Sequence, residues 1–136
     1  MSQKTFIDTL FVVPLANQRD QYNRQATDLA AAYEGQQFLT TDAVLLEIGN
    51  ALARRYRRQA VVILEDLLSS DDVEVVPLTP ALFGKALAVY KAHEDKEWGL
   101  IDCISFVAMR QSRIEDALTF DIHFVQAGFR ALMRDG

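Results

Sequence analysis

Apolar residues follow two recurring patterns along the chain: short runs rich in β-branched and aromatic residues, and longer stretches with helical spacing. The short runs predict buried strands. They cover residues 4–8, 37–39, 73–78 and 117–120, with a possible last strand through residue 133. The strand at 4–8 and the strand at 117–120 each lead directly into an aspartate, Asp8 and Asp121.

The stretches between these runs have the apolar spacing and capping residues of helices. Thr79 followed by Pro80, for example, places a capping hydroxyl ahead of a proline in the first helical turn. The first predicted helix runs from Asp20 to about residue 33, and the second is capped by Thr40 or Thr41. A third carries Val61, Leu64, Leu67 and Leu68 on a shared face, and a fourth runs from residue 80 to 93. A mostly buried helix from about Asp102 to residue 111 and a short turn before Gly128 complete the set.

Strands separated by helices pair in parallel through right-handed crossovers. The expected fold class is therefore α/β, a three-layer α/β/α sandwich around a short parallel sheet of four or five strands. The length of 136 residues, 50% of them hydrophobic, predicts a single domain over residues 1–136. Cys103 is the one cysteine, so the chain has neither a disulfide framework nor a cysteine-based zinc site.

The net charge of −5 argues against a protein that coats nucleic acid without sequence preference, although a local basic patch remains compatible with it. The N-terminus lacks a basic segment followed by a long apolar stretch, so no secretory signal is expected. The apolar run at residues 10–16 contains Pro14 and is far shorter than the roughly 20 residues that cross a bilayer. We therefore expect a cytoplasmic protein with no membrane segment.

Four acids stand inside or beside apolar sequence, whereas most other acids stand in polar runs. They are Asp8 after Phe-Ile, Glu47 in VLLEIGNAL, Asp102 in GLIDCISF and Asp121 after ALTF. Ionised carboxylates are rarely buried unless they are paired or bound to a metal. Because ligands of parallel sheets bind beyond the carboxyl ends of the strands, we expect Asp8 and Asp121 to converge there. A divalent cation would keep such carboxylates ionised, and Mg²⁺ or Mn²⁺ is the natural candidate.

Each of these acids also has a simpler explanation when it is considered alone. Asp102 can be an N-terminal helix cap, and Glu47 can lie on an exposed helix edge. Asp8 and Asp121 can be solvated strand ends. Spacing alone leaves both interpretations open.

Five segments resemble the PIN-domain ribonucleases, and in particular the VapC-type toxins of bacterial toxin–antitoxin pairs. The segments are FIDT, NQRDQYN, LLEIGNAL, WGLIDCISFVAM and LTFDIHFVQAGF, which together cover nearly the whole chain. Carried over residue by residue, the acidic quartet of that family falls on Asp8, Glu47, Asp102 and Asp121. The sequence departs from the family pattern at Leu10, where Ser or Asn is common, and at Asn23, where His is frequent.

The resemblance implies a Mg²⁺- or Mn²⁺-dependent endoribonuclease that hydrolyses RNA phosphodiester bonds by attack of water on phosphorus. It implies direct or water-mediated metal ligands at Asp8, Asp102 and Asp121, and a residue that shapes the site or orients the water at Glu47. Thr9 would hydrogen-bond a carboxylate or a metal-bound water, with a simple turn hydroxyl as the alternative. The implied partners are an RNA substrate, a small antitoxin whose helix fills a hydrophobic groove, and a second copy in a homodimer.

The densest positive charge in the chain surrounds Tyr56. It consists of Arg54, Arg55, Arg57 and Arg58. Such a cluster can bind RNA phosphates while the tyrosine stacks on a base. A solvated face or ion pairs within the protein are the alternative interpretations.

His123 lies two residues after Asp121, close enough to touch a substrate. The segment DIHF fits packing of the final turn equally well, so His123 is not included among the predicted catalytic residues. Cys103 follows Asp102 in an apolar helix, where a thiol behaves as a small hydrophobic side chain.

Two other functions remain open on the sequence alone. One is a PIN-type nuclease that processes RNA without being a toxin, and the other is a catalytically silent PIN module that binds RNA or protein. A receiver-type signalling module is not expected, because it needs a pair of early acids and a lysine after a late strand. Asp8 stands alone, and Asp121 is followed by Ile-His-Phe.

Overall fold

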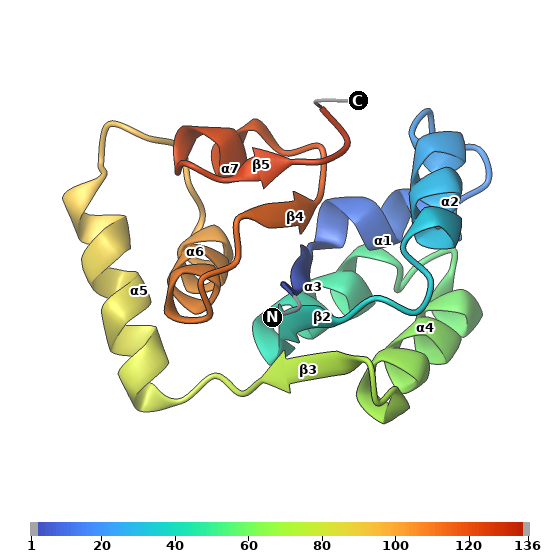
Figure 1. Ribbon diagram of the computed structural model, residues 1–136, viewed down its shortest axis with the longest axis horizontal. Helices are drawn as coiled ribbons and strands as arrows, with labels where there is room; N and C mark the ends of the chain where they lie inside the picture. Colours follow the sequence, from blue (N-terminus) through green and yellow to red (C-terminus); the bar gives the residue numbers. More distant parts are fainter. Residues whose placement is uncertain (1–2, 135–136) are drawn as a thin grey trace.

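A five-stranded parallel sheet forms the centre of the computed structural model, which describes residues 3–134 (Figure 1). The strands are β1 (Thr5–Ile7), β2 (Phe38–Thr41), β3 (Val73–Val76), β4 (Asp116–Leu118) and β5 (Arg130–Ala131). Their order across the sheet is β3-β2-β1-β4-β5, and every neighbouring pair is parallel. The predicted α/β class and parallel sheet are confirmed, with five strands.

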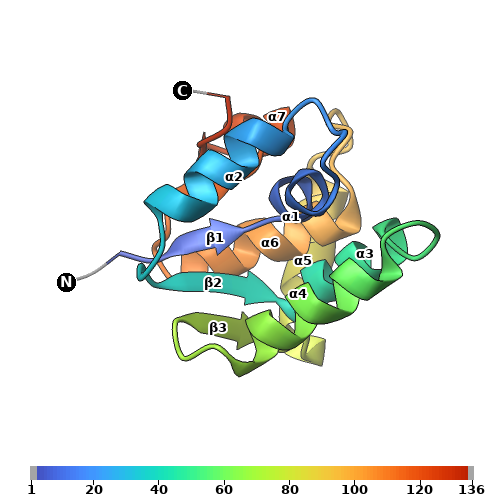
Figure 2. The ribbon, with the colours of Figure 1, turned by 90° about the vertical axis from the view of Figure 1, so that its right-hand side faces the viewer.

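Helices cover both faces of this sheet, as predicted for a three-layer sandwich. They are α1 (Thr9–Ala16), α2 (Asn23–Ala32), α3 (Asp42–Ala51), α4 (Arg57–Ser69), α5 (Pro80–Ala92), α6 (Leu100–Gln111) and α7 (Ile122–Gln126). Helices α1, α2 and α4 lie on one side and α5 and α6 on the other (Figures 1 and 2). Across residues 3–134, no helix has both the length and the apolar character that a membrane crossing requires.

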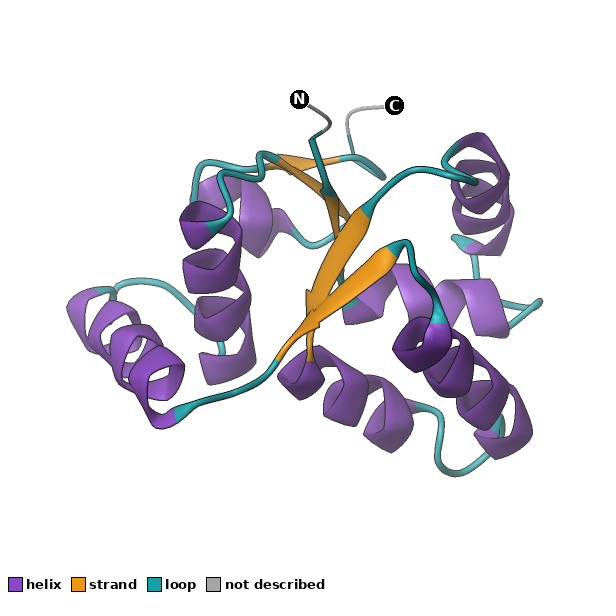
Figure 3. Cartoon of the chain, turned by 60° about the horizontal axis from the view of Figure 1, so that its bottom comes forward, coloured by secondary structure: helices purple, strands orange, loops and turns teal. Residues whose placement is uncertain are grey.

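Helix α3 lies at the carboxyl end of the sheet (Figure 3). It follows β2 without a loop, because the extended residue Thr41 ends the strand and caps the helix by accepting a hydrogen bond from the backbone N–H of Val44 at 3.1 Å. The helix contacts α1 and α4 on one side and α6 on the other. It therefore joins the two outer layers beside the strand ends.

The apolar run at residues 10–16, which the pattern leaves outside any predicted element, forms helix α1. Asp8 caps this helix, since its Oδ2 accepts a hydrogen bond from the backbone N–H of Leu10 at 3.3 Å. Pro14 lies inside the helix, and its carbonyl accepts a hydrogen bond from Asn23 Nδ2 at 2.8 Å. Burial of Phe11, Val12 and Pro14 itself offsets the loss of the backbone hydrogen bond that the proline removes.

Two details of the predicted helices are wrong. Helix α2 begins at Asn23, because Asp20 Oδ1 accepts from the backbone N–H of Tyr22 in a turn instead of capping a helix. On α4, Val61 and Leu68 are 48% and 65% exposed, so they do not share a buried face. Helix α4 covers the edge strand β3, and only a narrow face of it is buried.

Aromatic rings pack directly beneath the carboxyl end of β1. Phe6, Phe106 and Phe124 are fully buried. The rings of Phe106 and Phe124 meet edge to face at 5.0 Å, and those of Phe6 and Phe124 lie 6.1 Å apart. These contacts join β1, which precedes Asp8, to α6 and α7, which carry Asp102 and His123, and so fix the relative positions of these three residues.

Candidate active site

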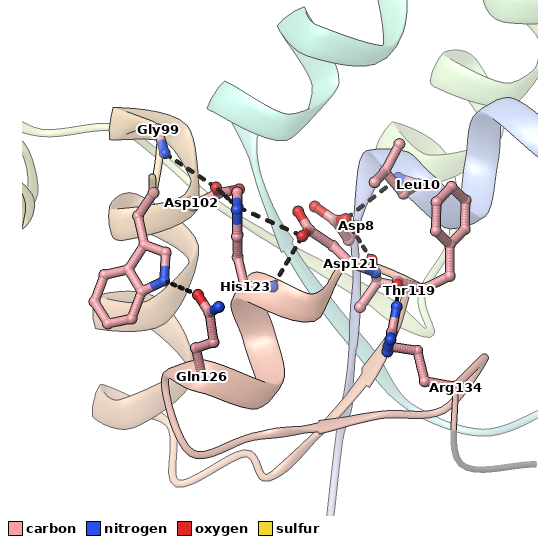
Figure 4. A network of polar contacts seen from close by, with 11 residues as sticks. Asp8, Leu10, Gly99, Asp102, Thr119, Asp121, His123, Gln126 and Arg134 are labelled. Carbon is pink, nitrogen blue, oxygen red and sulfur yellow. Dashed lines mark hydrogen bonds and ion pairs between the residues drawn. The ribbon is translucent and has the colours of Figure 1, made fainter. Parts of the chain in front are cut away.

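Acidic side chains from four separate segments meet at the carboxyl end of the sheet. Asp8 follows β1, Glu47 lies in α3, Asp102 lies in the first turn of α6, and Asp121 caps α7 after β4. Figure 4 shows the side chains of Asp8, Asp102 and Asp121 next to one another. The structure therefore brings together acids that are far apart in the sequence.

Asp8 is the most deeply buried of these acids, with 4% of its surface exposed. Its Oδ2 accepts hydrogen bonds from the Thr119 hydroxyl at 2.8 Å and from the backbone N–H of Leu10. The pKa of Asp8 is raised to about 7, chiefly by burial and also by the negative charges of Asp102 and Glu47, while the two hydrogen bonds oppose the rise. A cation at this point would remove much of the cost of keeping Asp8 ionised.

Thr9 follows Asp8 in the sequence and hydrogen-bonds Glu47, so it links these two acids. Its buried hydroxyl donates a short hydrogen bond to Glu47 Oε1 across the packed helices α1 and α3. Asp8 caps α1 and Thr9 is its first residue, so the start of this helix positions both the Asp8 carboxylate and the hydroxyl that holds Glu47. The contact is of the kind expected for Thr9, a hydroxyl that orients a carboxylate.

Asp102 lies in the first turn of α6, which begins at Leu100, close to the predicted start at about Asp102. Its Oδ2 accepts a hydrogen bond from the backbone N–H of Gly99 at 3.1 Å and lies 2.9 Å from His123 Nδ1. Burial raises the pKa of Asp102, and the charge of Asp121 adds to the rise, while the contacts with His123 and Gly99 oppose it.

Asp121 caps α7 by accepting a hydrogen bond from the backbone N–H of His123 at 2.9 Å, and the same Oδ1 lies 3.4 Å from His123 Nδ1. One ligand atom each of Asp102, Asp121 and His123 lie within 4.8 Å of one another. Asp8 adjoins this group through Thr119, whose hydroxyl also accepts from the backbone N–H of Asp121 at 3.1 Å.

His123 and Thr119 are site residues that the sequence analysis leaves out. A signal for His123 exists in the sequence, because the second residue of a helix lies beside the side chain that caps that helix. Asp121 followed by His123 therefore predicts proximity once Asp121 is recognised as a cap. Thr119 gives no such signal, since its contact with Asp8 spans 111 residues.

Aromatic and polar contacts fix the segment that carries Thr119, Asp121 and His123. The ring of Phe120 stacks on that of Tyr22 with centroids 4.0 Å apart, and Arg134 donates to the Phe120 carbonyl at 3.1 Å. Trp98 Nε1 donates to Gln126 Oε1 at 3.0 Å, which ties the loop before α6 to α7 (Figure 4).

The four arginines around Tyr56 are exposed. Arg54 and Arg55 lie in the turn after α3, and Arg57 and Arg58 begin α4. Within residues 3–134, none of the four takes part in a salt bridge, which disfavours an ion-pair belt. The Tyr56 hydroxyl donates to Asn17 Oδ1 at 2.8 Å, so this ring is held against α1.

The donor set at the strand ends fits a divalent cation. Carboxylate oxygens are the ligands that Mg²⁺ and Mn²⁺ prefer, and a bound cation would offset the cost of ionising Asp8 and Asp102, whose pKa values are raised chiefly by burial. These carboxylates can hold a metal ion at the carboxyl end of the sheet, where the ion can bind and polarise an electrophilic group of a substrate.

Comparison with known proteins gives a consistent result. Residues 5–130 match the PIN domain family. The sequence is 32% identical over 124 residues to the 23S rRNA-specific endonuclease VapC20 of Mycobacterium tuberculosis, in strains CDC 1551 and H37Rv alike, covering 91% of this chain and 94% of the relative. The crystal structure of that VapC20, described as a Sarcin-Ricin loop cleaving toxin, aligns with a TM-score of 0.84 at 31% identity, covering 93% of this chain and 96% of that one.

A more distant similarity supports the fold alone. The structure of VapBC2 from Rickettsia felis bound to a DNA fragment from their promoter aligns with a TM-score of 0.63 at 14% identity, covering 95% and 97% of the two chains. Because the family match extends over most of the sequence and the VapC20 alignment over nine-tenths of it, the chain belongs to the PIN-domain family and is a homologue of its VapC-type members.

Proposed function

We propose that this protein is a metal-dependent endoribonuclease, built as one domain, that serves as the toxin of a toxin–antitoxin pair. The observation that carries the proposal is that Asp8, Asp102 and Asp121 lie next to one another at the strand ends, with Glu47 held by Thr9 and near enough for its charge to raise the pKa of Asp8. Homology to an endonuclease over 91% of the chain supports the same reaction class.

In this proposal Asp8, Asp102 and Asp121 hold Mg²⁺ or Mn²⁺. The bound ion supplies the positive charge that activates water and polarises the phosphodiester. Thr9 holds one oxygen of Glu47 and thereby orients the other toward the attacking water. Thr119 and the N–H of Leu10 keep the Asp8 carboxylate aimed into the site.

The proposed substrate is RNA, and 23S rRNA is the first RNA to test, because VapC20 is named as a 23S rRNA-specific endonuclease. Such a substrate implies action in the cytoplasm. The exposed arginines Arg54, Arg55, Arg57 and Arg58 are proposed to bind its phosphates, since they form a positive surface in an acidic chain and make no salt bridge with any of residues 3–134.

The proposed antitoxin helix binds in a groove between α1, α2 and α4. This groove has a volume of about 310 Å³ and is mostly apolar. Its lining includes Phe11, Leu15, Ala30, Tyr33 and Leu67, with Glu34 and Asp66 as acidic members. An amphipathic helix with basic flanking residues would complement both properties.

A homodimer is proposed on the outer face of α5. Phe83, Leu87 and Tyr90 recur at helical spacing there and are exposed. An exposed apolar stripe of this kind is typical of an interaction surface. Light scattering should give twice the chain mass for the parent protein, and Leu87→Glu should give the mass of one chain.

Cleavage of purified ribosomal RNA tests the proposed activity. The parent protein should cut in the presence of Mg²⁺ or Mn²⁺ and not in EDTA, and Asp102→Asn and Asp121→Asn should each lower the rate by at least about 100-fold. Metal-independent cutting, or equal rates in the variants, would refute the nuclease proposal. Cutting without an effect on growth when the chain is expressed would favour an RNA-processing nuclease over a toxin.

A further inference from the structure

His123 is a part of the acidic site to which the proposed reaction gives no role. Its Nδ1 lies 2.9 Å from Asp102 Oδ2 and 3.4 Å from Asp121 Oδ1. The side chains of all three residues are partly buried, and the ring edge that carries Nδ1 faces both carboxylates (Figure 4). A ring turned outward to solvent or inward to the core would not have this arrangement.

The two separations from His123 Nδ1 are close to that of neighbouring ligands on one ion. Two ligands at about 2.1–2.2 Å from an octahedral cation and at right angles to each other lie about 3 Å apart. The observed separations from Nδ1, 2.9 and 3.4 Å, are close to this value, and one ligand atom of each of the three residues lies within 4.8 Å of the others. An ion could contact all three atoms after small side-chain shifts.

The backbone fixes His123 in this position. Asp121 Oδ1 accepts the backbone N–H of His123 at 2.9 Å, so the capping bond of α7 places the ring on the side of the acids. Phe124, the next residue, is fully buried against Phe6 and Phe106. The imidazole is therefore held from two sides before any ion binds.

We propose that His123 is a ligand, through Nδ1, of the divalent cation held by Asp102 and Asp121, and that it makes the site select Mn²⁺ over Mg²⁺. This inference rests on the proposed metal-dependent function. Mg²⁺ is a hard ion that takes oxygen ligands and keeps its waters, whereas an imidazole nitrogen suits transition-metal ions. Replacing one oxygen ligand by a nitrogen therefore favours the transition metal of the two candidates.

The chain offers a matched control in His93, its only other histidine. His93 Nδ1 lies 2.9 Å from the carbonyl of Val89, and its ring packs on Trp98 with centroids 4.8 Å apart. His93 is not a member of the group formed by Asp102, Asp121 and His123.

Pulsed electron paramagnetic resonance of the Mn²⁺-loaded protein tests the inference directly. A nitrogen coupling should be visible in the parent and in His93→Gln, should change when the histidines carry ¹⁵N, and should be absent in His123→Ala and His123→Asp. Calorimetric titration should show that His123→Ala weakens Mn²⁺ binding by about 10–100-fold and Mg²⁺ binding by less than about threefold. His123→Asp, which offers an oxygen ligand in place of the nitrogen, should bind Mg²⁺ about as well as the parent and Mn²⁺ more weakly than the parent.

The outcomes separate this inference from the proposed function. If the parent binds both ions but shows no nitrogen coupling, or if His123→Ala keeps the parent preference, the ligand role of His123 is refuted while metal binding stands. If the parent binds neither ion, both proposals fail. Should His123→Ala not fold, as circular dichroism would show, the ¹⁵N measurement on the parent protein alone decides.

Discussion

The Thr119 hydroxyl donates a hydrogen bond to Asp8 Oδ2 at 2.8 Å inside the protein, across 111 residues of sequence. Both residues are buried, and the same hydroxyl accepts the backbone N–H of Asp121. One side chain thus aligns the ends of β1 and β4 and stabilises the charged form of Asp8. It links the stability of the sheet to the geometry of the site.

Thr119→Val should lower the stability of the sheet and disturb the geometry of the site. The valine has nearly the same shape but leaves Asp8 Oδ2 and the N–H of Asp121 without their partner, which costs about 1–3 kcal/mol of unfolding free energy. It should also raise the pKa of Asp8, because the hydrogen bond from Thr119 lowers it. Chemical denaturation and an NMR titration measure the two effects. Thr119→Ser, which keeps the hydroxyl, should stay close to the parent in pKa, and an unchanged pKa in Thr119→Val would contradict the assignment.

Asp8→Asn should stabilise the metal-free protein at pH 8. The folded-state pKa of about 7 lies above the unfolded value of 3.8, so the contribution of Asp8 to stability is fully present below pH 3.8 and is lost as pH rises through 7. The variant avoids this loss, with a gain of up to about 4 kcal/mol at pH 8 that should shrink toward zero at pH 4. Thermal denaturation in EDTA at several pH values measures it.

Added Mn²⁺ should reverse the order of the two proteins. A ligand that binds only the folded state stabilises it in proportion to its affinity, and the parent binds the ion with a full set of carboxylates. The parent should therefore gain more in melting temperature than Asp8→Asn. A difference in stability between the two proteins that did not change with pH in EDTA would show that burial does not raise the pKa of Asp8.

The positions of Asp8 and Asp121 could be predicted from the sequence because both depend on local rules. Each follows a short apolar strand, and parallel strands end at the same edge of a sheet. Thr41 and Thr79 likewise cap their helices as the pattern predicts, since capping needs only the next three residues.

Features that depend on tertiary packing could not be predicted in this way. Helix α1 contains Pro14, and the helix exists because its apolar side chains are buried against the sheet. The exposure of Val61 and Leu68 reflects the position of α4 over an edge strand, which helical periodicity does not reveal. The contact of His123 with Asp102 joins two helices and has no signature in the spacing of either.

Arg54→Ala combined with Arg55→Ala should weaken RNA binding and reduce its salt dependence. If both arginines contact phosphates, the slope of log affinity against log salt should fall by about 1.4, since each phosphate contact on a single strand contributes about 0.7. Affinity at physiological salt should fall by about tenfold or more. Titrations at several salt concentrations measure both, in a catalytically silent Asp102→Asn background.

The control for this pair is Lys85→Ala combined with Lys91→Ala. Both lysines are exposed on α5, across the sheet from α4 (Figure 1). The control removes the same formal charge and should leave the slope within error of the parent. Equal losses in the two double variants would mean that RNA responds only to net charge.

Leu67→Gln should abolish antitoxin binding while Leu68→Gln should not. The two neighbours differ in place: Leu67 lines the groove between α1, α2 and α4, whereas Leu68 is 65% exposed and lies outside the lining. Loss of an apolar contact at the centre of an interface weakens binding by about 2 kcal/mol or more, roughly 30-fold. Tagged Asp102→Asn protein carrying either change can be purified from the native host. The small partner should be recovered with Leu68→Gln and lost with Leu67→Gln, and equal recovery would place the antitoxin elsewhere.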